Sequence, residues 1–125
     1  MEIGYPQATL TTVAFADGNG TASVLRSTGG AFFGGGDAGV QRAREEFLKH
    51  AQLSLSQMSQ VTDFPEPNVG QVVFYTRTDR GVYAASASVE ELQPVGHPLR
   101  ELYFAGLRVL NEYLRLQKQA QQAQQ

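Results

Sequence analysis

The chain has 125 residues, which is too short for two domains that each bury their own core. Its hydrophobic content of 42% is enough for one packed core. Ten basic and twelve acidic residues give a net charge of −2, which argues against nucleic acid and anionic membranes as partners. There is no cysteine and no apolar run near the ~20 residues that span a bilayer, so disulfides, cysteine-bound zinc and membrane spans are excluded. We expect a soluble cytoplasmic protein, with one domain over 1–118 and a glutamine-rich tail over 119–125.

The two halves of the sequence share one layout: two β-rich runs, a glycine-bearing turn and a long amphipathic helix. In the first half the β-rich runs cover 10–16 and 22–28, and a third short strand is expected over 31–33. A tight glycine-rich turn between the first two runs would put Val13 on the same face as Val24. Both faces of this hairpin carry apolar residues, whereas a sheet with only one covered face normally alternates more cleanly.

The first helix is expected to run from Ala38 to about Met58. Asp37 precedes it as an N-cap, where a carboxylate accepts the free amides of the first turn and suits the helix dipole. Apolar residues recur along it at spacings of three and four and form one stripe, made of Val40, Ala43, Phe47, Ala51, Leu55 and Met58. Residues 59–69 include two prolines separated by one residue, which forbid a helix and favour an extended connector.

The second hairpin is expected to join strands over 71–78 and 82–88. Residues 79–81 between them suit a bulged turn, in which the glycine takes the left-handed position. In the register that this turn sets, Tyr75 and Tyr83 lie on the same face of the sheet. Neither face of this hairpin is clearly polar.

The last helix is expected to follow Gly96 and His97, with Pro98 at the first helical position, where a missing amide costs nothing. Its main apolar stripe consists of Leu99, Leu102, Tyr103, Gly106, Val109, Leu110, Tyr113 and Leu114. Phe104, Leu107 and Leu116 widen this apolar arc beyond what packing on one sheet face requires.

These elements predict an α+β fold, in which an antiparallel sheet of four to five strands packs against two long amphipathic helices. The predicted order is β-β-(β)-α-β-β-α. This order resembles the layout of profilin-like and roadblock-type domains, in which hairpins and helices alternate around one antiparallel sheet.

The most suggestive motif is the G-x-G-x-x-G spacing formed by Gly34, Gly36 and Gly39 at the start of the first helix. In dinucleotide-binding folds this spacing lets backbone amides approach a pyrophosphate. Here the preceding strands form a hairpin instead of a βαβ unit, and Asp37 would place a negative charge beside the phosphate. We therefore favour a flexible turn with an aspartate cap and keep anion or nucleotide binding as the alternative.

The remaining candidates are His97, at the entrance of the last helix, and the aromatic residues Tyr75 and Tyr83, whose hydroxyls could converge in a pocket. Neither His97 nor His50 has a partner at metal-ligand spacing on its own helix, so no metal site is predicted. No serine or lysine lies in a setting that would activate a nucleophile, so no catalytic residue can be named.

The excess of apolar surface, on two-sided strands and on the wide last helix, predicts a non-enzymatic interaction module that forms a homodimer or binds another protein. The alternative is a small-molecule-binding domain with its site near Gly34–Gly39 and His97. We expect no cofactor, no metal, and no nucleic acid or membrane as a partner.

Overall fold

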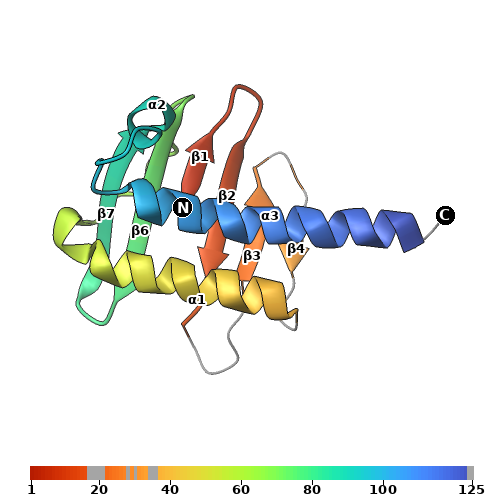
Figure 1. Ribbon diagram of the computed structural model, residues 1–125. Helices are drawn as coiled ribbons and strands as arrows, with labels where there is room; N and C mark the ends of the chain where they lie inside the picture. Colours follow the sequence, from red (N-terminus) through yellow and green to blue (C-terminus); the bar gives the residue numbers. More distant parts are fainter. Residues whose placement is uncertain (17–21, 28, 30, 34–36, 124–125) are drawn as a thin grey trace.

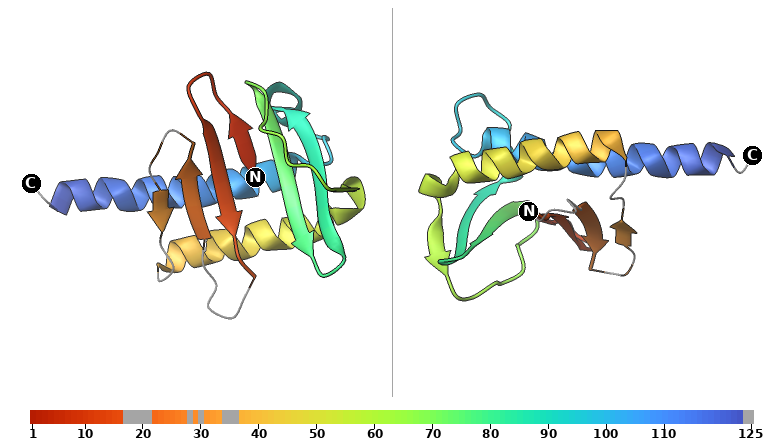
Figure 2. Two further views of the ribbon diagram at one scale, coloured as in Figure 1. Left: turned by 180° about the vertical axis from the view of Figure 1, so that it is seen from behind. Right: turned by 90° about the horizontal axis from the view of Figure 1, so that it is seen from below.

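The computed structural model describes residues 1–16, 22–27, 29, 31–33 and 37–123 of the chain. Within them, the fold has two layers: a sheet of seven strands, and two long helices that cover one of its faces (Figures 1 and 2). The strands are β1 (Glu2–Gly4), β2 (Thr9–Ala14), β3 (Ala22–Arg26), β4 (Ala31–Phe33), β5 (Ser59–Val61), β6 (Gln71–Thr78) and β7 (Gly81–Ser88). The helices are α1 (Ala38–Leu53), α2 (Val89–Leu92) and α3 (Arg100–Ala123), with a short 3-10 helix η1 (Leu55–Gln57).

The strand order in the sheet is β4-β3-β2-β1-β6-β7-β5, and every neighbouring pair is antiparallel. The predicted α+β class, single antiparallel sheet and two long helices are confirmed. The sheet is wider than expected because β1 and β5 have three residues each, too few to show a period of two in the sequence. The first strand of the chain therefore lies in the middle of the sheet, between β2 and β6.

The turn between β6 and β7 has two residues, because Thr78 pairs directly with Gly81. The predicted bulged turn is wrong, although Gly81 does adopt a positive φ of 129°. The shorter turn shifts the register by one residue, so that Tyr75 pairs with Ala84. A shift of one residue exchanges the two faces of a strand, and Tyr75 and Tyr83 consequently lie on opposite faces of the sheet.

The register of the first hairpin also differs from the prediction. Val13 pairs with Ser23, and not with an even-numbered residue of the second strand as a tight turn would require. The turn itself falls on residues outside the described part of the chain. With this register Leu25 pairs with Thr11, so Leu25 and Val13 share a face of the sheet.

Helix α1 begins at Ala38 as predicted, and the Asp37 carboxylate caps it by accepting the Val40 amide at 3.0 Å. It ends at Leu53, earlier than expected, and η1 and β5 follow before the proline-containing connector. Met58 is nevertheless buried in the core, as its place in the predicted stripe required.

Helix α3 begins at Arg100, two residues after Pro98. His97 stabilises the start of this helix because its Nδ1 accepts the Leu99 amide at 3.1 Å. Before it, the single turn of α2 is held by a capping box in which Ser88 and Glu91 each accept the other's backbone amide. The sequence analysis did not predict α2.

The hydrophobic core lies between the sheet and the two long helices. Ile3, Val72 and Phe74 enter it from the middle strands, and α1 and α3 close it as an antiparallel pair lying side by side on the sheet (Figure 1). The wide apolar arc of α3 is explained by this arrangement, because one flank faces the sheet and the other faces α1. Phe104, Leu107 and Leu116, which extend the arc, are partly buried against the core.

Candidate functional site

The sheet is divided along part of its length, because β1 stops before its two neighbours do. Glu2 pairs with Thr11 on one side and with Val73 on the other, and Met1 is the first residue of the chain. In the described chain, β2 beyond Thr12 is paired only with β3, and β6 beyond Val73 is paired only with β7. The inner edges of β2 and β6 therefore continue past β1 without a strand between them.

A cleft of about 530 Å³ occupies this division. Residues 13–16 form one wall and residues 75–77 the other, while Phe47, Leu48 and Ala51 of α1 form the floor. The view from the bare side of the sheet in Figure 2 shows α1 crossing behind β2 and β6 at this level. The cleft thus opens on the face of the sheet that α1 and α3 leave uncovered, which we call the open face.

The connector of residues 62–70 lies on the open face of the sheet, at the mouth of the cleft. Phe64 packs edge-on against Tyr75, with ring centroids 5.5 Å apart, and lines the cleft itself. The Tyr75 hydroxyl donates to the Pro65 carbonyl oxygen at 3.4 Å, and the Gly70 amide donates to the Gly4 carbonyl oxygen at 2.8 Å. These contacts fix the aromatic side of the cleft.

Ionisable groups gather at the inner end of the cleft, next to β1. Burial raises the pKa of the Glu2 carboxyl above its usual value. The pKa of Tyr75 is also raised, first by burial and then by the nearby Glu2 carboxylate. Burial lowers the pKa of the Met1 α-amino group to about 6, although this group donates to the Thr12 carbonyl oxygen at 2.9 Å.

The residues that line the cleft are apolar side chains with a few polar and ionisable groups among them. Its walls and floor are mostly apolar, and their charged side chains are Glu2 and Arg77. Among the described lining residues there is no histidine, lysine or serine that could serve as base or nucleophile. A mostly apolar cavity with a few polar groups is the usual form of a ligand site.

The predicted site residues that the structure describes do not come together. Tyr75 lines the cleft, whereas Tyr83 pairs with Thr76 on the other face, which packs on the helices. Gly39 lies in the first turn of α1 and His97 just before α3, and because these two helices run antiparallel the two residues lie at opposite ends of the helical layer (Figure 1). Gly34 and Gly36 lie outside the described residues.

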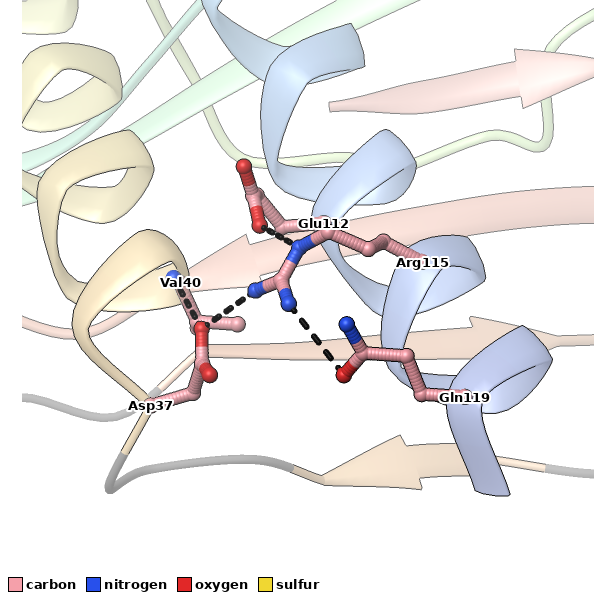
Figure 3. Close-up of polar contacts among 5 residues, drawn as sticks. All are labelled: Asp37, Val40, Glu112, Arg115 and Gln119. Carbon is pink, nitrogen blue, oxygen red and sulfur yellow. Dashed lines mark hydrogen bonds and ion pairs between the residues drawn. The ribbon is translucent and has the colours of Figure 1, made fainter. Parts of the chain in front are cut away.

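The start of α1 is held by a polar network that links it to α3 (Figure 3). The Asp37 carboxylate that caps Val40 also accepts a bond of 2.7 Å from Arg115, and Arg115 bonds to Glu112 at 2.7 Å. The Val40 amide and the Arg115 cation lower the pKa of Asp37. A Cβ on Gly39 would lie 2.5 Å from Glu112 Oε2, so this glycine makes room for the ion pairs.

Sequence reasoning missed Met1, Glu2, Phe15, Phe64 and Arg77 as cleft residues. The apolar residues Met1 and Ile3 alternate with the charged Glu2, which is typical of a strand, but three residues are too few to distinguish this pattern from chance. The division of the sheet depends on which strands become neighbours, and no local pattern carries that information.

Comparisons with protein-family models, curated proteins and solved structures gave no match. In the described part of the chain, none of the helices combines the length and the apolar character needed to cross a membrane. The same residues contain no cluster of three histidine, aspartate or glutamate side chains suited to a metal ion.

Proposed function

We propose that this protein is a non-enzymatic interaction module that forms a homodimer through the open face of its sheet. The observation that carries the proposal is a group of large apolar side chains exposed on this face. Phe15 is 47% exposed, Leu25 38% and Phe64 54%. Exposed apolar side chains that cluster on one face commonly mark a binding surface.

The open face supports the proposal better than the last helix does. Most of the apolar arc of α3 packs within the chain, against the sheet and α1. Among the described residues of α3, Leu114 is the one large apolar side chain that is exposed. Among the described residues, no helix lies over the bare face of the sheet (Figure 2). Self-association would bury this face.

The homodimer can be tested by sedimentation velocity at high micromolar concentration. We expect the wild-type chain to sediment as a dimer, and a Phe15→Ser, Leu25→Ser double variant to shift towards monomer because both changes remove apolar surface from the open face. Leu53→Ser and Val95→Ser are the matched controls, since these side chains are also exposed but lie at the end of α1 and before α3. A wild-type protein that remains a 13.6 kDa species throughout would rule the homodimer out.

The cleft supports a second candidate function, the binding of a small molecule. Its volume of about 530 Å³ falls in the usual range of ligand pockets, roughly 300–1,000 Å³. The cleft offers more enclosed space for such a ligand than the start of α1, where Asp37 already accepts the Val40 amide. The expected cytoplasmic location, which rests on the lack of cysteine and of an apolar run long enough to span a bilayer, stays a prediction.

A further inference from the structure

We propose that the cleft between β2 and β6 accepts an extended peptide segment of another polypeptide, which pairs with both strands and continues the line of β1. This inference goes beyond the homodimer, because it concerns a strand inserted in the plane of the sheet and not a contact between two open faces. The two activities are measured separately, so each can fail without the other.

The inner edge of β2 presents backbone groups to the cleft. Thr12 and Met1 exchange both of their backbone hydrogen bonds, at 2.8 and 2.9 Å. Along an antiparallel strand, the residues that bond to one neighbour alternate with those that bond to the other. Ala14, two residues further on, therefore directs its N–H and C=O groups into the division of the sheet, where the described chain has no strand.

The inner edge of β6 does the same from the other side. Thr78 and Gly81 flank a two-residue turn, which makes them a hydrogen-bonded pair. The even-numbered residues of β6 therefore bond to β7, and the odd-numbered residues bond towards β1. Beyond the end of β1 these are Tyr75 and Arg77, whose backbone groups face the cleft.

The division has the width and direction of one missing strand. At Glu2 the strands β2 and β6 are neighbours of the same strand, so they lie two strand spacings apart, about 9–10 Å. β1 is antiparallel to both of them. A peptide that runs in the direction of β1 would be antiparallel to both walls and could satisfy the backbone groups of each.

The register of β1 also assigns the chemistry of the peptide. Continued past Met1, it places one peptide residue between Phe15 and Arg77, with its side chain on the open face. The guanidinium of Arg77 has no ion pair among the described residues, and an acidic side chain at this position would lie beside it. The geometry therefore favours an acidic residue here.

The next peptide residue lies between Ala14 and Thr76, and its side chain points to the opposite face. There it meets the apolar floor formed by Phe47, Leu48 and Ala51 of α1. An apolar side chain is favoured at this position because it removes apolar surface from water. The expected ligand is thus an extended segment with an acidic residue directly followed by an apolar one.

The test is a binding titration with the blocked peptide Ser-Thr-Ser-Glu-Val, followed by the amide signals of the ¹⁵N-labelled protein. The peptide ends at the valine opposite Ala14, which leaves the space of one residue before Met1. We expect saturable shifts at Ala14, Tyr75 and Arg77. N-methylation of the peptide valine should weaken binding by about tenfold or more, because it removes the bond to β2. A Glu→Lys peptide should bind more weakly, and the exposed-site variant Arg77→Glu should reverse this preference.

Three results would overturn the proposal. The first is an N-methylated peptide that binds as tightly as its parent, which would show apolar packing without strand pairing. The second is the loss of the charge preference in both proteins. The third is no binding of any of these peptides to a protein that is folded by the same amide spectrum. Because Arg77 is exposed, its variant should fold normally, and its own spectrum checks this.

Discussion

Replacing Phe74 with alanine is expected to lower the free energy of unfolding by about 3–5 kcal/mol. Phe74 is 2% exposed and lies in the middle of the core, between the central strand β6 and the helical layer. Alanine would leave a cavity at this position. The neighbouring strands and helices cannot move in to close it, because their other side chains are already packed against one another. The loss would be a large part of the stability of a domain of this size.

Leu53→Ala is the control for this variant, because it also removes a large apolar side chain, but from a position at the end of α1 that is 67% exposed. We expect chemical denaturation to show a change of less than about 1 kcal/mol for it, since surface positions contribute little. If the two variants unfold at the same denaturant concentration, the helix-covered face of β6 has been assigned wrongly.

Lowering the pH from about 8 to about 6 is expected to destabilise the chain that begins at Met1, by about 2 kcal/mol. Burial lowers the pKa of the Met1 α-amino group from its usual value near 8 to about 6 in the folded state. Between these two values the unfolded chain binds more protons than the folded one. Stability therefore rises with pH through this window and is fully present above the unfolded pKa.

Denaturation midpoints measured across this pH range test the prediction. A variant without histidine, H50Q with H97N, provides the background, and the asparagine side chain can still accept the Leu99 amide. Glu2 acts in the opposite direction at lower pH, since its raised pKa makes the folded state bind protons more readily. A midpoint that does not change between pH 8 and 6 in this background would mean that the amine is hydrated and not buried.

Local elements of the fold could be predicted well from the sequence. The start of α1 at Ala38, its Asp37 cap and the strand at Ala31–Phe33 follow from short-range chemistry, and the structure confirms them. The length of the β6–β7 turn could not be predicted, because Gly81 fits both a bulged turn and a two-residue turn. The difference of one residue in the length of this turn determines which face Tyr75 and Tyr83 occupy, and therefore which residues the predicted pocket contains.

The cleft could not be predicted from the sequence, for a different physical reason. It exists because β1 lies between β2 and β6 and is shorter than both, and this depends on pairings between residues about 70 positions apart. Phe15 and Arg77 look like ordinary strand residues until the pairing places them across the division. The sequence does indicate that the hairpins carry apolar residues on both faces, and the exposed Phe15 and Leu25 agree with that.

Native-state hydrogen exchange of the amides of β6 tests the division of the sheet most directly. In the peptide-free protein we expect slow exchange at Phe74 and Thr76, whose amides bond to β7, and fast exchange at Tyr75 and Arg77, whose amides face the cleft. On the other wall, Thr12 should be protected by Met1 and Ala14 should not. Equal protection along β6 and at Ala14 would show that the sheet is closed there, and would contradict both the cleft and the peptide that we place in it.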